Sequence, residues 1–469
     1  MTAFAEPQPM PVPGPMPGRV DPRSPGLWVL LVGIAFGAWQ IVPPLITSAR
    51  GFGEIVVPNL LVTLVASLIG LTLIRRLLRP VEAPPWSGTW LMLLWGGFGA
   101  TGVAILANDA LQAVWAKGIG ISFGTRWGAA STAPLNEEAA KAAGVLLLAA
   151  VSTRLVRSAA DGVVFGALSG LGFEVVENLL YGFRSVAQAG GVDPVGASAV
   201  TIGIRVVLTG LGSHWAMSVV ACAGVGYLVA ANGRPLALRL AVAFGCFLWA
   251  VGMHWLFDSP LLAGTIGVGL KVLVNFVSAL VVILVVRALF RRRVRQVAAE
   301  ETDLGVLWPG ETATLLGRHA RRKARRRFHR GPKREAQASL QRAQLDLLEE
   351  RVPVETPVEA ADPWRAEVRR RRERLDLTVT DESLRTNRAV MLPYRRRVRL
   401  VVRGERARWP IGDDGANTAA STVRVAEELG PLGGRRRDRG VEPSRRGTGA
   451  AWRRRRREGQ RLHPSTARR

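Results

Sequence analysis

Four groups of polar residues interrupt otherwise apolar stretches of this 469-residue chain. Residues three or four positions apart share a face of a helix, so the members of each group can act together. An ionisable side chain within a membrane segment costs about 2.5–3.5 kcal/mol, so its presence calls for a reason. The groups are Asn136-Glu137-Glu138 with Lys141; Glu174, Glu177 and Asn178; His214; and His254 with Asp258.

Histidines and carboxylates together indicate one kind of chemistry. They can bind a divalent cation such as zinc. A bound metal lowers the pKa of water, and a nearby carboxylate can accept the proton. The chain has five histidines, and the two in its apolar part, His214 and His254, both belong to these groups.

The elements that must position these groups are membrane-spanning helices. A bilayer core about 30 Å thick needs roughly 20 apolar residues per helix. Hydropathy predicts about eight spans, with a loop carrying a re-entrant or interfacial piece over Asn108 to Leu135. The expected spans are Leu27–Thr47, Ile55–Ile74, Trp90–Leu106, Ala139–Val156, Val163–Phe183, Val200–Ala230 (long enough to be kinked), Leu236–Phe257 and Leu261–Phe290.

The alternation of basic and weakly charged loops predicts the orientation of these spans. Lysine and arginine concentrate in cytoplasmic loops, which predicts that both termini are cytoplasmic and that the chain is a multi-pass protein of the cell membrane. With that orientation, all four polar groups lie between the membrane midplane and the extracytoplasmic surface. We therefore expect them to meet in one water-accessible cavity inside a helix bundle.

Charge divides the chain into two unlike parts. The whole chain carries 63 basic and 36 acidic residues, and 46 and 24 of these follow position 290. We therefore predict an all-α protein, a polytopic transmembrane helix bundle with a basic, partly helical and partly disordered C-terminal tail. The expected segments are a Pro-rich disordered leader at 1–26, the transmembrane domain at 27–290 with its core at about 90–290, a basic helical cytoplasmic segment at 291–352, and an Arg-rich, largely disordered tail at 353–469.

The four groups resemble the motifs of PrsW-type intramembrane proteases. Glu137-Glu138-Ala-Ala-Lys141 resembles their EExxK motif, and Phe173-Glu174-Val-Val-Glu177-Asn178 resembles their FExxEN motif. His214 and His254-x-x-x-Asp258 complete the pattern. The resemblance covers roughly Trp90 to Phe290. The related CAAX-prenyl and bacteriocin-processing proteases carry EExxxR, FxxxH and HxxxN in the same order.

The resemblance implies hydrolysis of peptide bonds in membrane-anchored protein substrates near the extracytoplasmic side, such as the first cut in a membrane-bound anti-sigma factor. Glu137 or Glu138 would activate water, and His214 and His254 would bind a metal, zinc by expectation, or polarise the scissile carbonyl. Asp258 would orient His254 or act as a ligand. Glu177 stands where the relatives have histidine and is a tentative third ligand, although this exchange alters the ligand set. Lys141, Glu174 and Asn178 would support the site.

Other interpretations of the same residues remain open. A transporter or ion-binding membrane protein could use the same polar cavity without proteolysis, and a membrane scaffold could depend on its tail alone. The basic tail is expected to attract anionic lipid headgroups of the bilayer. It has no interleaved aromatic residues, so no nucleic-acid partner is expected. Lys271 is interpreted as a snorkelling or loop residue, and Arg205 has no assigned role.

Overall fold

The computed structural model describes residues 20–378 except 80, 153, 231–232, 329–330 and 355–357. These residues form helices and connections without a strand, which confirms the predicted all-α class. In chain order the helices are α1 (Pro25–Gly51), η1 (Gly53–Ile55), α2 (Val56–Leu73), η2 (Ile74–Leu78), α3 (Trp86–Leu94), η3 (Trp95–Ala100), α4 (Thr101–Gly118), α5 (Ile121–Val151), α6 (Ala159–Gln188), α7 (Pro194–Gly203), η4 (Ile204–Leu208), η5 (Gly210–Gly212), α8 (His214–Val229), α9 (Leu236–Asp258), α10 (Gly264–Asp303), α11 (Pro309–Leu315), α12 (Arg318–Arg326), α13 (Pro332–Glu350), η6 (Glu359–Ala361) and α14 (Asp362–Thr378).

Seven helical stretches in the described residues are long and apolar enough to cross a membrane. About eight spans were expected, and the difference lies in α5. This helix has 31 residues, but the charged side chains of Glu137, Glu138 and Lys141 reduce its apolar character. The seven stretches are Pro25–Gly51, Gly53–Leu78, Trp86–Gly118, Ala159–Gln188, Gly210–Val229, Leu236–Asp258 and Gly264–Asp303.

The segment expected as a loop between Asn108 and Leu135 is helical instead. Helix α4 continues to Gly118 and α5 begins at Ile121, so the connection is a turn at Ile119 and Gly120. Gly120 has a φ of +127°, a conformation that side chains other than glycine rarely adopt. Asn108 and Glu137 therefore face each other from two antiparallel helices that pack along their lengths.

The long apolar run from Val200 to Ala230 is broken in its middle. Helix α7 and η4 end at Leu208, the turn η5 follows, and α8 starts at His214. A Cβ on Gly212 would lie 2.4 Å from the carbonyl oxygen of Val272, so only glycine allows this approach to α10. The break places His214 in the first turn of α8 rather than within a continuous helix.

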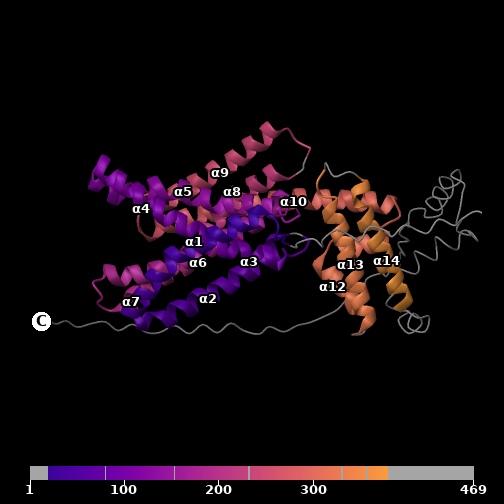
Figure 1. Cartoon of the computed structure of the whole chain (residues 1–469), viewed down its shortest axis with the longest axis horizontal. Coiled ribbons are helices and arrows are strands. Elements are labelled where there is room, and N and C mark those ends of the chain that lie inside the picture. The colour runs from indigo at the N-terminus through magenta and orange to yellow at the C-terminus, as the bar shows by residue number, and fades with distance from the viewer. Residues whose placement is uncertain are drawn as a thin grey trace, which may run out of the picture. The chain divides into compact units, whose positions relative to one another are not determined.

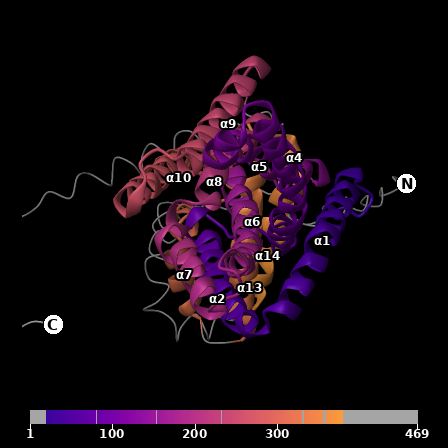
Figure 2. The same cartoon turned by 90° about the vertical axis from the view of Figure 1, so that its left-hand side faces the viewer.

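Helix α6 lies at the centre of the bundle, with α1, α2, α5 and α8 around it (Figure 2). Ser158 accepts a hydrogen bond from the backbone NH of Asp161 and so caps its N-terminus. Three glycines four residues apart, Gly162, Gly166 and Gly170, face α8. A Cβ on any of them would lie 2.0–2.5 Å from a backbone or side-chain atom of α8. This stripe brings the two helices close together, as small residues do in membrane bundles.

Helices α11–α14 lie at one end of the bundle, where the long helix α10 leads to them (Figure 1). Arg79 pairs with Asp161 at 3.1 Å, and both Arg79 and Arg157 pair with Glu349 of α13. Helix α14 packs on α13. It lies entirely after Val352, where the helical segment was expected to end. Most of the Pro-rich leader, 1–19, and the tail beyond 378 fall outside the described residues.

Candidate active site

Helix α5 contributes a buried ionic group at the start of the predicted EExxK motif. The ammonium of Lys141 donates to Glu138 at 2.8 Å and to Glu137 at 3.3 Å. It also lies 4.1 Å from the centre of the Phe173 ring. The side chains of Lys141 and Glu138 are fully buried. An ammonium with two carboxylates compensates the cost of placing these charges in the bundle.

Helix α6 contributes Glu174, Glu177 and Asn178 from adjacent turns. Glu177 accepts hydrogen bonds from the guanidinium of Arg205 and from His214, the latter at 2.7 Å. Asn178 accepts a second hydrogen bond from Arg205 at 2.7 Å. Glu174 is buried, and one of its oxygens has no hydrogen-bond partner among the described residues.

His214 connects the α5 group to the α6 group. Its Nδ1 lies 2.9 Å from Lys141 Nζ, which can only donate, so this nitrogen is the acceptor. Its Nε2 therefore carries the proton and donates to Glu177. Phe173 packs on the imidazole with 4.8 Å between ring centres. One contact thus sets the tautomer of His214, and the tilted packing of Phe173 against the imidazole restricts its orientation.

His254 approaches the same point from α9. Its Nδ1 lies 3.1 Å from Glu138, and its Nε2 lies 3.4 Å from Asp258 one turn later. The rings of His254 and His214 are 5.3 Å apart. The structure thus brings together all the residues that the sequence singles out for the site, from four helices that are distant in the chain.

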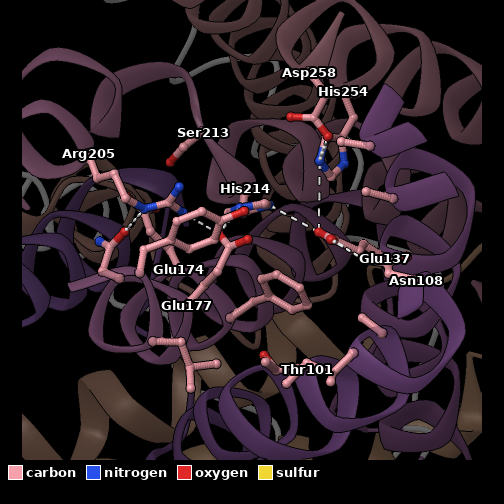
Figure 3. Close-up of a pocket in the computed structure, with 18 of the residues that line it drawn as sticks. Thr101, Asn108, Glu137, Glu174, Glu177, Arg205, Ser213, His214, His254 and Asp258 are labelled. Carbon is pink, nitrogen blue, oxygen red and sulfur yellow. Dashed lines mark hydrogen bonds and ion pairs between the residues drawn. The ribbon is translucent and has the colours of Figure 1, made fainter. Parts of the chain in front are cut away.

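A cavity of about 190 Å³ opens beside this cluster (Figure 3). Glu137 faces it, whereas Glu138 and Lys141 lie behind its wall. Polar and charged residues of several helices line it, as expected for a water-accessible site within a bundle. Its lining includes Asn108, Asp109, Gln112, Glu137, Glu174, Glu177, Asn178, Arg205, His214, His254 and Asp258.

Glu137, His214 and His254 form a possible metal site, with one donor atom from each within 4.8 Å of the others. Glu137 Oε2 lies 3.6 Å from His214 Nδ1 and 3.8 Å from His254 Nε2. Two imidazoles and a carboxylate are a common donor set for a catalytic zinc ion. The other nitrogen of each ring contacts a further carboxylate, Glu177 or Glu138, the usual way to orient a histidine ligand. The residues present therefore fit a divalent metal.

The grouping differs from the tentative ligand set of the sequence analysis in one member. Glu137 takes the place expected for Glu177, because Glu177 contacts the far nitrogen of His214 and is held by Arg205. Lys141 contacts two of the three donor atoms, so a bound metal would share Glu137 and His214 with its ammonium.

Two residues that bind the carboxylates of the site were missed by sequence reasoning. Arg205 binds both Glu177 and Asn178, and its guanidinium lies 4.1 Å from the centre of the Tyr181 ring. It had the same signal as the others, an ionisable residue in an apolar run. Asn108 donates to Glu137 at 3.0 Å, and it was overlooked because its segment was expected to be a loop.

Comparison with known proteins decides the family. Residues 84–288 match the family described as PrsW family intramembrane metalloprotease. This segment belongs to the PrsW family. It agrees with the range of about Trp90 to Phe290 over which the resemblance was expected. No curated protein and no solved structure matches the chain.

The match of residues 84–288 to the PrsW family indicates the general activity. The chain is a peptidase of the intramembrane metalloprotease type, and the family implies a divalent metal. Its apolar helices make it a multi-pass membrane protein. The family match indicates that it acts by intramembrane proteolysis. The cavity where His214, His254 and Glu137 meet is the candidate site for this reaction.

Proposed function

We propose that the chain is an endopeptidase that cuts membrane-anchored proteins at the cavity lined by Glu137, His214 and His254. One observation carries the proposal. Two buried imidazoles from different helices face the same carboxylate oxygen, and a polar cavity adjoins all three groups. A structural ion pair needs neither the second histidine nor the cavity.

The cavity lining supports one of the two candidate bases of the EExxK motif over the other. Glu137 lines the cavity and can contact an attacking water, whereas Glu138 is fully buried between Lys141 and His254. We therefore assign water activation to Glu137. Glu138 and Glu177 hold the two imidazoles in position, and Asp258 lies 3.4 Å from the Nε2 of His254 that would face the metal.

We propose zinc as the metal, held by His214 and His254, with the carboxylate of Glu137 beside it. A bound zinc ion would increase the acidity of water and polarise the scissile carbonyl. His214 presents Nδ1 and His254 presents Nε2 toward this position, and the carboxylates behind them keep these lone pairs oriented.

The depth of the cavity supports cleavage near the extracytoplasmic side. Glu177 follows Asp161 by 16 residues of one helix, which corresponds to about 24 Å at the helical rise. Asp161 lies at the end of the bundle that bears the arginines Arg79 and Arg157. If both termini and these arginines are cytoplasmic, the cavity opens in the opposite half of the membrane. Site-1-type cleavage of a membrane-bound anti-sigma factor is the specific form that we propose.

The peptidase proposal is tested by co-expression with a candidate single-span substrate that carries a tag at each end. Glu137→Gln and His254→Ala should each lower cleavage at least about 100-fold, since general acid–base catalysis contributes that much. Glu54→Gln, at an exposed carboxylate outside the site, should cleave like the wild type. Full cleavage by both site variants, at equal protein levels, would contradict the proposal. Solute flux without cleavage would favour a transporter.

The metal is tested separately by elemental analysis of detergent-purified protein. The wild type and Glu54→Gln should retain about one zinc ion per chain, and His214→Ala should lose it. A metal-free, active wild type would overturn the zinc assignment and leave Glu137 as a metal-independent base. A different metal in stoichiometric amount would correct its identity alone.

A further inference from the structure

A second cavity, of about 650 Å³, lies far from the peptidase site, at the end of the bundle near α12 and α13. Its walls come from the end of α2 with η2, the connection before α3, and helices α12 and α13. Helix α12 alone contributes four arginines to it, Arg318, Arg321, Arg322 and Arg325. Arg75 and Arg76 of η2 and Arg342 of α13 face them.

The positive charge of this cavity far exceeds the negative charge of its lining. Glu82 is the only acidic residue of its lining, and none of the seven arginines has a carboxylate within 4.0 Å among the described residues. Arg318 and Arg321 donate instead to backbone carbonyls, such as Arg79 at 3.0 Å and Val81 at 2.5 Å. These contacts hold the guanidinium groups in place without neutralising them.

The pKa values of the arginines reflect this crowding. The pKa of Arg325 is lowered by burial and then by the charges of Arg322 and Arg342. Burial also lowers the pKa of Arg318 and Arg321. A bound anion would relieve both effects, since it would replace lost hydration and offset like-charge repulsion.

A buried amide in the same wall has unused hydrogen-bonding groups. Gln341 of α13 is 3% exposed and lines the cavity. Neither its amide nitrogen nor its amide oxygen has a partner among the described residues. Buried amides are nearly always paired, so this side chain indicates a ligand or ordered water in the cavity.

The other wall of the cavity is apolar and belongs to a membrane-spanning stretch. Leu68 and Leu71 of α2 contribute to it, and Leu68 is 54% exposed. Trp86 stands at its rim, with the guanidinium of Arg75 3.5 Å from its ring centre. Tryptophan and arginine side by side at the end of a span are typical of the level of lipid headgroups. A ligand here meets positive charge at one end and hydrocarbon at the other.

We propose that this cavity binds the phosphate group of an anionic phospholipid, with an acyl chain along Leu68 and Leu71. The arginines of α12 and the amide of Gln341 surround the headgroup. The basic segment is expected to attract anionic lipid in general, and this cavity would be one defined lipid site within it. It does not depend on the peptidase chemistry, because the two cavities share no residue.

The test uses the full chain in nanodiscs or detergent with added phosphatidylglycerol, and native mass spectrometry to count retained lipid. The wild type should retain phosphatidylglycerol in preference to phosphatidylcholine. Arg322→Gln with Arg325→Gln should weaken that retention at least about tenfold, as expected when charge-assisted hydrogen bonds are lost. The matched control is Lys323→Gln with Arg326→Gln, which removes equal charge from α12 outside the cavity.

Each result has a defined meaning. Selective weakening by the cavity pair supports the site, and equal weakening by the control pair would show that only net charge matters and overturn it. No preference for phosphatidylglycerol in the wild type would also overturn it. Inorganic phosphate and pyrophosphate serve as soluble competitors. If either displaces the lipid at low concentration, the cavity binds phosphate from a soluble source, and the lipid assignment fails.

Discussion

At the scale of single residues, the site depends on carboxylates that bind side chains rather than substrate. Arg205 holds Glu177 and Asn178 together, and Glu177 in turn holds His214. Arg205→Lys would keep the charge but lose the planar fork that reaches both acceptors. We expect cleavage to fall about tenfold or more, and its pH profile to shift, with little change in thermal stability.

The pH profile separates this positioning role from a structural one. Arg50→Lys, at an exposed arginine outside the site, is the control and should leave both rate and profile unchanged. An Arg205→Lys variant with a normal rate and profile would show that His214 is positioned without the guanidinium.

Much of the site could be predicted from single residues, because ionisable side chains in apolar helices are costly and therefore conspicuous. Glu137, Glu177, His214 and His254 were all found this way. Their division into possible ligands and orienting groups could not be predicted, since it depends on how each helix is rotated about its axis. Arg205 was left out because it belongs to none of the recognised motifs.

At the scale of elements, hydropathy located the helices but not their breaks. The run from Val200 to Ala230 has the composition of one long span, yet Gly210 and Gly212 end one helix before His214 starts the next. A hydropathy average is insensitive to two glycines. The opposite error occurred over Asn108–Leu135, where polar residues that face the cavity were interpreted as a loop.

The packing of α6 on α8 offers a test of how the elements place His214. A Cβ on Gly166 would lie 2.4 Å from the Ser218 carbonyl oxygen and from Cys222 Cβ. Gly166→Ala should therefore push the helices apart, with a loss of about 1–3 kcal/mol of stability and most of the activity. Thermal unfolding in detergent and the cleavage assay measure the two effects.

Gly245→Ala in α9 is the matched control, because nothing lies within 4 Å of a Cβ there. It should leave stability unchanged or raise it, since alanine favours the helix. If Gly166→Ala behaves like Gly245→Ala, the glycine stripe does not set the distance between α6 and α8.

At the scale of the whole molecule, helices far apart in the sequence meet in a charged layer where the bundle joins α13. Burial, followed by the charges of Glu82 and Glu349, raises the pKa of Asp346 to about 7, while Arg157 and Arg371 act in the opposite direction. The folded protein then binds a proton that the unfolded chain releases near pH 4. Stability should fall as the pH rises from about 4 to 7.

Asp346→Asn removes this titration and gives the test. Its melting temperature should exceed that of the wild type by an amount that grows from pH 5 to pH 8, on the order of 1–2 kcal/mol in stability after solvent screening. A difference that is the same at every pH would show that Asp346 titrates normally. Contacts of this layer could not be predicted from sequence, because they join residues almost 200 or more positions apart.

Glu349 is translated long after the two arginines that it binds. Arg157 emerges from the ribosome 192 residues before the carboxylate that it binds, and Arg79 emerges 270 residues before it. The peptidase helices are therefore translated before this shared carboxylate, whereas Asp161, the other partner of Arg79, is already present. We expect the contacts of Glu349 to form late, so a nascent chain truncated before α13 would contain every residue that lines the catalytic cavity but not the carboxylate that joins Arg79 to Arg157.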